Sequence, residues 1–417
     1  VALESRDWRQ LWHMAFGLAP ELAPKHCVSR LLTAAANNSN DACPNDDAIL
    51  DAMRVGARPG AKSGEHRRTL LITGGLGNIG LTLLRSLLVD PYVSPTEAEK
   101  APLPSSFRVV IVDNSKRPLP KDLIRFVNDK RLFIHRFDML DEEQLQTVFD
   151  DNKSDMLGVI HLAAVSRVST CERNTTRCLA VNMRATELLT SVMTNTFPEH
   201  YKAPFLIFTS SREVFGDTQD NVVDENSIQN PLNVYGTSKA FAETHVRRFA
   251  DHGYRCVILR LSNVYGSWED LLERVTPNFV CRAMANRPLQ VVGGNQQLAL
   301  IHIDDIVRGI ELALAHAAQQ RADAYVEIAH LAAPVKPIGI VQWARQIIQA
   351  TNSTADVAII DSDGISVDNY NTFVDKAEML LGFRARVSRE EGLQKFIASY
   401  PFKKGEMCPV LRGQRGV

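Results

Sequence analysis

The segment Leu70-Leu-Ile-Thr-Gly-Gly-Leu-Gly-Asn-Ile-Gly80 decides the fold of this chain. The apolar run at 69–73 predicts a buried strand, and the glycines after it open an amphipathic helix predicted over about 79–89. Glycines at G-x-G-x-x-G spacing permit a tight turn, let a pyrophosphate approach the backbone, and let helix and strand pack closely. The helix N-terminus adds unpaired N–H groups and a positive dipole end. We therefore predict a dinucleotide-binding turn.

Further apolar runs alternate with helical stretches along the chain. This alternation is typical of βαβ units, which build a parallel sheet with helices on both faces. The predicted fold is α/β, a Rossmann-type doubly wound parallel sheet with a smaller C-terminal α/β region for substrate and an N-terminal helical extension. The later strands are expected at 108–113, 132–138, 158–164 and 205–211, with helices at 142–149 and 179–194.

Breaks in composition suggest the domain boundaries. Residues 1–66 are expected to form an N-terminal helical extension, with short helices at 8–16 and 28–36 bounded by loops. An NAD-binding domain is predicted over 67–262, interrupted by a proline-rich surface insertion near 90–106.

The composition restricts the partners. Forty-seven basic and forty-eight acidic residues leave a net charge of -1, so neither nucleic acid nor an anionic membrane is an expected partner. The chain shows no signal-peptide pattern at its start and no run of roughly 18 apolar residues. The seven cysteines are scattered, which predicts free thiols in a reducing, cytoplasmic setting and no metal site. We expect a small-molecule substrate and allow for a homodimer.

An acid closes the second predicted strand. In dinucleotide folds an Asp such as Asp113 binds the adenosine ribose hydroxyls and repels a 2′-phosphate, so NAD is favoured over NADP. The spacing from Gly80 is longer than usual because of the insertion. The nearby Arg117 keeps NADP open as an alternative cofactor.

A tyrosine and a lysine four residues apart, Tyr235 and Lys239, share one face of a predicted helix. A lysine ammonium near a phenol lowers the phenol's pKa from about 10 towards neutrality. Tyr235 is therefore a candidate general base or acid for an alcohol/ketone pair. Ser211, at the end of the fifth predicted strand, is placed to share the substrate oxygen with it. Alone, the tyrosine and lysine would equally fit an exposed helix face.

These motifs together resemble the extended short-chain dehydrogenase/reductase family, in particular its NAD-dependent epimerase/dehydratase branch, which includes UDP-glucose 4-epimerases. The resemblance covers about residues 69–400. It implies that residues 263–417 form a substrate-binding region, of which 300–330 returns to the NAD-binding domain. It rests on Thr73-Gly-Gly-Leu-Gly-Asn-Ile-Gly80, His161-Leu-Ala-Ala164, Ser210-Ser-Arg-Glu-Val-Phe-Gly216, Tyr235-Gly-Thr-Ser-Lys239, Leu259-Arg-Leu-Ser-Asn-Val-Tyr-Gly266, Ile301-His-Ile-Asp-Asp305 and Leu381-Gly-Phe near Glu390-Glu-Gly-Leu393.

The resemblance implies roles for individual residues. Tyr235 would take a proton from a sugar hydroxyl as the carbon gives its hydride to NAD, Lys239 would hold the nicotinamide ribose, and Ser211 would bind the reacting oxygen. The implied cofactor-binding residues are Gly74, Gly77, Asn78, Ile79, Gly80, Asp113, Asn114, Asp138, Met139, Leu162, Ala163, Ala164, Asn182, Tyr235 and Lys239. The implied substrate-binding residues are Arg212, Glu213, Asn263 and Asn278.

The residues after Ser211 bear on the reaction. Similar 4,6-dehydratases carry an Asp-Glu pair there, whereas this chain has Arg212-Glu213 and lacks the acid for the leaving group. A 4-epimerase needs neither residue, so a nucleotide-sugar 4-epimerase with a transient 4-keto intermediate is the favoured interpretation. A decarboxylase stays open because Arg212 suits a carboxylate. A dehydratase, a dehydrogenase of a non-nucleotide polyol or sugar acid, and a non-catalytic NAD-sensing protein also stay open.

The chain departs from the family where the substrate's diphosphate is held. The family usually has an Arg about three residues before the segment matching 301–305, where this chain has 296–300 without one. A second Arg is expected before Asp375, yet none lies between Arg345 and Arg384. Losing charged contacts to a diphosphate weakens binding unless they are replaced. The candidate replacements are Arg274, Arg282, Arg287, Lys336 and Lys376.

Overall fold

The computed structural model describes residues 68–88, 107–218, 222–320, 324–361 and 370–400. The helices predicted within 1–66 and the insertion near 90–106 lie outside the described residues, as does the end of the region assigned to substrate.

A seven-stranded parallel sheet forms the centre of the described chain, in the order β12-β7-β5-β4-β1-β2-β3. The predicted α/β class and doubly wound parallel sheet are confirmed. The order reverses between β1 and β4, and ligands bind such sheets at the carboxyl ends beside this point. The strands are β1 (Arg68–Thr73), β2 (Phe107–Val112), β3 (Leu132–His135), β4 (Met156–His161), β5 (Phe205–Ser211), β7 (Arg255–Leu261) and β12 (Tyr325–Leu331).

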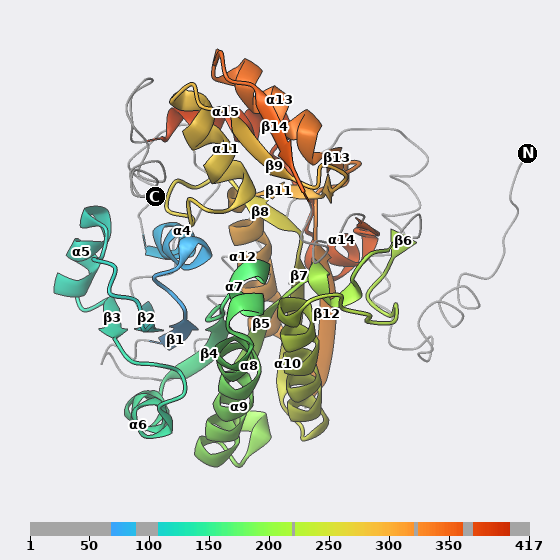
Figure 1. Cartoon of the computed structure of the whole chain (residues 1–417). Helices are drawn as coiled ribbons and strands as arrows, with labels where there is room; N and C mark the ends of the chain where they lie inside the picture. Colours follow the sequence, from blue (N-terminus) through green and yellow to red (C-terminus); the bar gives the residue numbers. More distant parts are fainter. Residues whose placement is uncertain (1–67, 89–106, 219–221, 321–323, 362–369, 401–417) are drawn as a thin grey trace, which may run out of the picture. The chain divides into compact units, whose positions relative to one another are not determined.

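Helices cover both faces of the sheet (Figure 1). Apolar side chains of alternate strand residues point to opposite faces, which creates two separate hydrophobic cores. One core joins the sheet to α4 (Asn78–Leu88), α5 (Lys121–Asn128), α12 (Ile303–Gln319) and α14 (Asp375–Leu381). The other joins it to α6 (Glu142–Asn152), α9 (Ala185–Thr196) and α10 (Val234–Asp251).

The single helix predicted over 179–194 is interrupted. The chain forms α8 (Thr175–Leu179), one π-helical turn (Ala180–Arg184) and then α9. The buried Asn182 lies in the π turn, where its Oδ1 accepts from Val165 N at 2.7 Å and its Nδ2 donates to Val165 O at 3.0 Å. The wider turn thus ties the helix to the segment after β4, and π turns of this kind often occur at functional sites.

The prediction of free thiols is wrong for at least three cysteines. Cys171 in α7 (Val168–Arg173) and Cys178 in α8 form a disulfide, with Cα atoms 5.0 Å apart. Cys281 is disulfide-bonded as well, while Cys256 is a buried free thiol. The pairing of Cys171 with Cys178 arises because the two short helices turn back on each other, which the spacing alone does not show.

A third core lies in the C-terminal part of the chain around the buried Trp343. It packs α11 (Val275–Met284), α13 (Ile340–Ala350) and α15 (Arg389–Ala398) against β9 (Leu289–Val292), β11 (Leu300–His302) and β14 (Val357–Ile360). The parallel pair of β11 with β8 (Asn263–Tyr265) connects it to the end of β7. Small pairs complete the described strands: β10 (Gln297–Leu298) with β13 (Ile338–Gly339), and β6 (Val222–Val223) with β15 (Asn371–Thr372).

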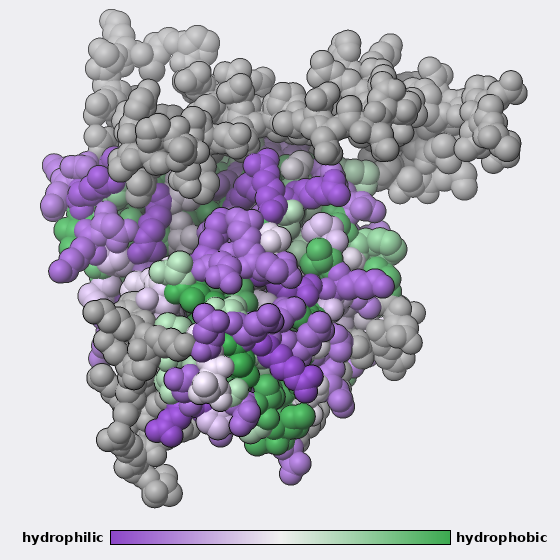
Figure 2. Space-filling view, turned by 90° about the horizontal axis from the view of Figure 1, so that it is seen from above, coloured by the Kyte–Doolittle hydropathy of each residue, from purple (hydrophilic) through white to green (hydrophobic). Residues whose placement is uncertain are grey.

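Polar residues dominate the described surface seen from above, and apolar residues form smaller areas between them (Figure 2). No helix within the described ranges is long and apolar enough to cross a bilayer.

Candidate active site

The glycine turn between β1 and α4 is too tight for side chains. A Cβ on Gly74, whose φ is +71°, would lie 2.6 Å from Ala163 N, and a Cβ on Gly80 would lie 2.5 Å from Gly75 O. Asn78, the first residue of α4, has a buried Oδ1 without a hydrogen-bond partner among the described residues. Exposed backbone, a helix N-terminus and a free polar atom suit the pyrophosphate of a dinucleotide.

A cavity of about 1290 Å³ opens from this turn along the carboxyl ends of the strands. It exceeds the roughly 300–1,000 Å³ typical of single-ligand pockets, so it has room for a dinucleotide and a second molecule. Its wall contains every predicted site residue except Asn182 and Lys239, which are buried behind it. The predicted residues in the wall are Gly74, Gly77, Asn78, Ile79, Gly80, Asp113, Asn114, Asp138, Met139, Leu162, Ala163, Ala164, Ser211, Arg212, Glu213, Tyr235, Asn263 and Asn278.

Two carboxylates lie at the ends of β2 and β3. Asp113 accepts hydrogen bonds from Leu76 N at 2.9 Å and Ser115 N at 2.8 Å, which fixes it beside the glycine turn. Asp138 pairs with Arg177. The hydrogen bond from Arg177 lowers the pKa of Asp138 against the effect of desolvation, so the carboxylate stays charged. Arg177 also lines the cavity, although it belongs to no sequence motif.

Ser211 and Tyr235 meet at the cavity wall. Ser211 ends β5, and Tyr235 lies in the first turn of α10, whose N-cap Asn233 accepts from Gly236 N at 2.8 Å. The side chains of Ser211 and Tyr235 are hydrogen-bonded to each other. A hydroxyl and a phenol so placed can both contact one substrate oxygen.

Lys239 does not contact the phenol as the helix spacing suggested. Its Nζ donates to Thr209 O at 2.8 Å, and its pKa is lowered to about 8 by burial. Burial also raises the pKa of Tyr235, while Arg274, the Ser211 hydrogen bond and Arg212 act in the opposite direction. The charges that oppose this effect of burial come from Arg274 and Arg212, and a lowering of the pKa of Tyr235 by Lys239 stays a prediction.

Arg212 and Glu213 form a buried ion pair beside Ser211, with Arg212 Nη2 3.0 Å from Glu213 Oε1. Glu213 Oε2 accepts from Asn233 Nδ2 at 2.9 Å, so both carboxylate oxygens are held. Arg212 Nη1 is buried and has no hydrogen-bond partner among the described residues. The guanidinium also lies 5.4 Å from the ring centre of Tyr370.

The candidate replacements for the missing arginines differ in their access to the cavity, and Arg282 is the most constrained of those that reach it. Arg282 lines it, but its three nitrogens already donate to Asn278 Oδ1, Pro288 O and Gln290 Oε1 at 2.9–3.2 Å. Leu298 occupies the wall three residues before Ile301. Of the candidate replacements for the missing arginines, Arg274 and Arg282 line the cavity, whereas Arg287, Lys336 and Lys376 do not.

Several wall residues carried no sequence signal. Among them are Ser166, Glu269 and Asp270. They belong to loops with no motif of their own, and only the folded chain brings them to the cavity.

Comparison with known proteins gives consistent matches. Residues 70–329 match the model of the NAD dependent epimerase/dehydratase family. The chain is 27% identical to human dTDP-D-glucose 4,6-dehydratase over 351 residues, which is 82% of this chain and 92% of that protein.

Among the solved structures that share the fold are two enzymes that act on sugar nucleotides. One is DesIV, a dTDP-glucose 4,6-dehydratase from Streptomyces venezuelae with NAD and TYD bound, with a TM-score of 0.67 and 23% identity over 80% of this chain and 96% of that one. The other is UDP-glucose 4-epimerase from Thermotoga maritima with UDP-glucose, with a TM-score of 0.67 and 22% identity over 79% and 98% of the two chains.

Proposed function

We propose that this chain, which belongs to the NAD dependent epimerase/dehydratase family and is an NAD-dependent enzyme, is a nucleotide-sugar 4-epimerase working through a transient 4-keto sugar. The observation that carries the proposal is the hydrogen-bonded pair Ser211 and Tyr235 at the cavity wall, beside a Glu213 whose two oxygens are already held. A dehydratase needs a free acid and base at 212 and 213, and an epimerase does not.

The residues present fit NAD at the glycine turn. Gly74–Gly80 and Asn78 would hold the pyrophosphate, and Asp113 the adenosine ribose. Bound NAD supplies a hydride acceptor and donor within the cavity. Tyr235 takes the proton from the sugar hydroxyl as its carbon is oxidised, and Ser211 holds the resulting carbonyl oxygen. Tyr235 returns the proton when the hydride is added back on the opposite face, so no net oxidation occurs.

Interconversion of UDP-glucose and UDP-galactose without net NADH is the direct test. Tyr235→Phe is expected to lower turnover by about 10²–10⁴-fold, because it removes the proton carrier but not the ring. NAD should still co-purify with the variant. Unchanged turnover would refute the role of Tyr235, and steady NADH formation from a free polyol would refute the epimerase.

A hexuronate decarboxylase is the second candidate, and Arg212 favours it. The buried guanidinium beside Ser211 has one nitrogen without a hydrogen-bond partner in the described part of the chain, which suits a substrate carboxylate. Oxidation at C4 would give a β-keto acid that loses carbon dioxide. Release of carbon dioxide from UDP-glucuronate, without epimerisation of UDP-glucose, would replace the first proposal by this one.

A further inference from the structure

The segment Ser267–Arg274 between β8 and α11 crosses the cavity, and we call it the strap. Residues 269–274 line the cavity, and Glu269 and Asp270 are buried while Trp268 and Leu271 are exposed. A surface connection of this length has no packing reason to bury two carboxylates, so their partners decide what the strap does.

Glu269 attaches the strap to the wall formed after β1 and β2. Arg85 of α4 binds it through two parallel contacts, Nη1 to Oε2 at 2.6 Å and Nη2 to Oε1 at 2.9 Å. Arg117, which follows β2, donates to Glu269 O at 3.0 Å. Arg85 is itself oriented by Asp122, its Nε lying 2.7 Å from Oδ2. The hydrogen bond with Glu269 raises the pKa of Arg85 despite its partial burial, so the pair stays ionised.

Arg274 and Glu273 attach the other end of the strap to the opposite wall, which follows β4. Arg274 Nη2 donates to Ser166 Oγ at 2.6 Å, and Arg167 Nη1 lies 3.7 Å from Glu273 Oε2. Within the strap, Asp270 Oδ1 forms an ion pair with Arg274 Nε at 3.0 Å. Because β1 lies between β2 and β4 in the sheet, the two attachments stand on either side of the glycine turn.

We propose that the strap closes the cavity over bound NAD and retains the cofactor through many turnovers, with the Arg85–Glu269 pair as its lock. NAD leaves only after this bidentate pair opens. A retained cofactor must be regenerated in place, which suits a reaction that returns its hydride and not one that releases NADH. The inference goes beyond the proposed function, because it rests on NAD dependence and not on the identity of the sugar.

Release of NADH from the full-length protein tests the lock. The protein is loaded with NADH, and the fall of its fluorescence is followed after addition of excess NAD. Glu269→Gln should accelerate release by about tenfold or more, because one strong charge-assisted pair closes the path. The double variant Arg85→Glu with Glu269→Arg should recover at least part of the retention. Glu199→Gln, which breaks an exposed pair with Lys202 far from the cavity, is the control and should leave the rate unchanged.

Glu273→Gln provides a second reading if Glu269→Gln does not fold. Its partner Arg167 lies at 3.7 Å and the glutamate is largely exposed, so a smaller acceleration of about two- to threefold is expected. The proposal is overturned if Glu269→Gln folds with wild-type thermal stability and releases NADH at the wild-type rate, or if Glu273→Gln, used in its place, leaves the rate unchanged. Absence of epimerase activity would not affect this test of the strap, since NADH release is measured without a sugar.

Discussion

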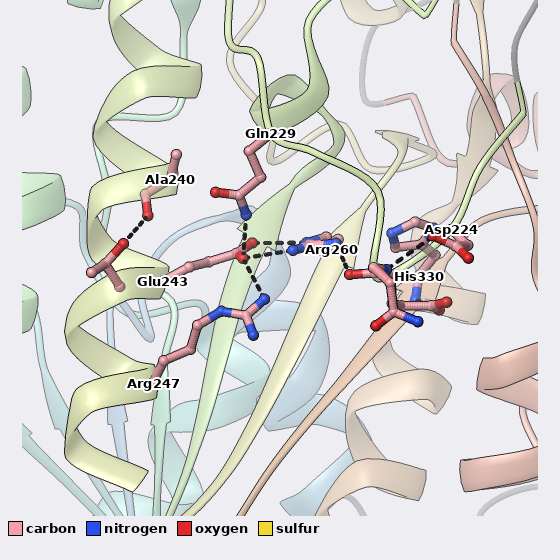
Figure 3. Close-up of polar contacts among 10 residues, drawn as sticks. Asp224, Gln229, Ala240, Glu243, Arg247, Arg260 and His330 are labelled. Atoms are coloured by element: carbon pink, nitrogen blue, oxygen red, sulfur yellow. Dashed lines mark hydrogen bonds and ion pairs between the residues drawn. The ribbon is translucent and has the colours of Figure 1, made fainter. Parts of the chain in front are cut away.

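Two buried arginine–glutamate pairs in this molecule differ in how completely they are satisfied. Arg260 of β7 meets Glu243 of α10 through two contacts, Nε to Oε1 at 2.9 Å and Nη2 to Oε2 at 2.8 Å, and its Nη1 donates to Glu225 O (Figure 3). Gln229 adds a further bond to the same carboxylate at 2.6 Å. Arg212 makes one such contact, to Glu213, and keeps an unpartnered Nη1 among the described residues.

The positions of the pairs explain this difference. The first pair lies between the sheet and α10, away from the cavity wall, and it holds those elements together. The second is part of the wall beside Ser211. A buried charge is retained at low cost only when its bonding groups are satisfied. An arginine in a cavity wall whose guanidinium lacks a hydrogen-bond partner is therefore best explained by a ligand. An arginine whose nitrogens are all bonded within the protein is explained by its role in the fold.

The largest expected effect is a loss of stability when the Arg260–Glu243 pair is broken. Arg260→Met leaves the carboxylate of Glu243 buried without its main partner and should lower the free energy of unfolding by about 3–5 kcal/mol, measured by urea denaturation. Arg247→Met is the matched control, because Arg247 is half-exposed and 3.8 Å from the same carboxylate. It should cost about 0–1 kcal/mol. Equal losses in both variants would contradict the structural role of Arg260.

A smaller effect is expected when the Arg212–Glu213 pair is broken, and it concerns catalysis rather than stability. Arg212→Met removes a positive charge that lowers the pKa of Tyr235, so the phenolate becomes harder to form. We expect kcat/KM to fall by about tenfold at pH 7 and the pH–rate profile to move to higher pH. The loss of stability should stay well below that of Arg260→Met. An unshifted profile would contradict the effect of Arg212 on the pKa of Tyr235.

A third, graded effect concerns the pH dependence of stability at the edge of the Arg260 network. Burial and the nearby Arg260 lower the pKa of His330 to about 3. Below its ordinary value of about 6.5 the unfolded chain binds a proton that the folded chain does not, so stability falls as the pH drops from 6.5 towards 3. Each pH unit in that window costs about 1.4 kcal/mol for this histidine.

His330→Gln should therefore reduce the slope of unfolding free energy against pH between 6 and 4. The buried His161, whose pKa is also lowered to about 3, keeps part of the slope in that variant. Urea denaturation at several pH values measures this slope for the wild type and for the variant. Identical slopes in wild type and His330→Gln would contradict the assignment of a neutral buried imidazole.

Local sequence patterns were sufficient for five of the seven strands of the sheet and for the glycine turn at the cavity wall. The apolar run before Gly74 and the glycines themselves are explained by contacts within about ten residues and by the neighbouring strand. The positions of Asp113 and Ser211 at the cavity were also predictable, because a residue that ends a parallel strand lies at the edge of the sheet where ligands bind. The π turn at Asn182 was missed because its cause, the backbone of Val165, lies in another element.

Side-chain partners were the least predictable feature. The four-residue spacing places Tyr235 and Lys239 on one helix face but does not show that Thr209 O takes the ammonium. Neither the Cys171–Cys178 bond nor the Arg85–Glu269 pair, separated by 184 residues, follows from a local pattern. Such choices depend on which groups meet after folding and on how strongly burial penalises each charge.

The sequence by itself determined the parallel α/β sheet, the glycine turn and the residues that end its strands, because periodicity and backbone sterics act over short distances. Only the tertiary structure decided which arginines have all their hydrogen-bonding groups satisfied and which face the cavity. It also decided where the strap is attached and that burial raises the pKa of Tyr235. These properties belong to contacts between distant segments, whose strength depends on desolvation and geometry that no linear pattern contains.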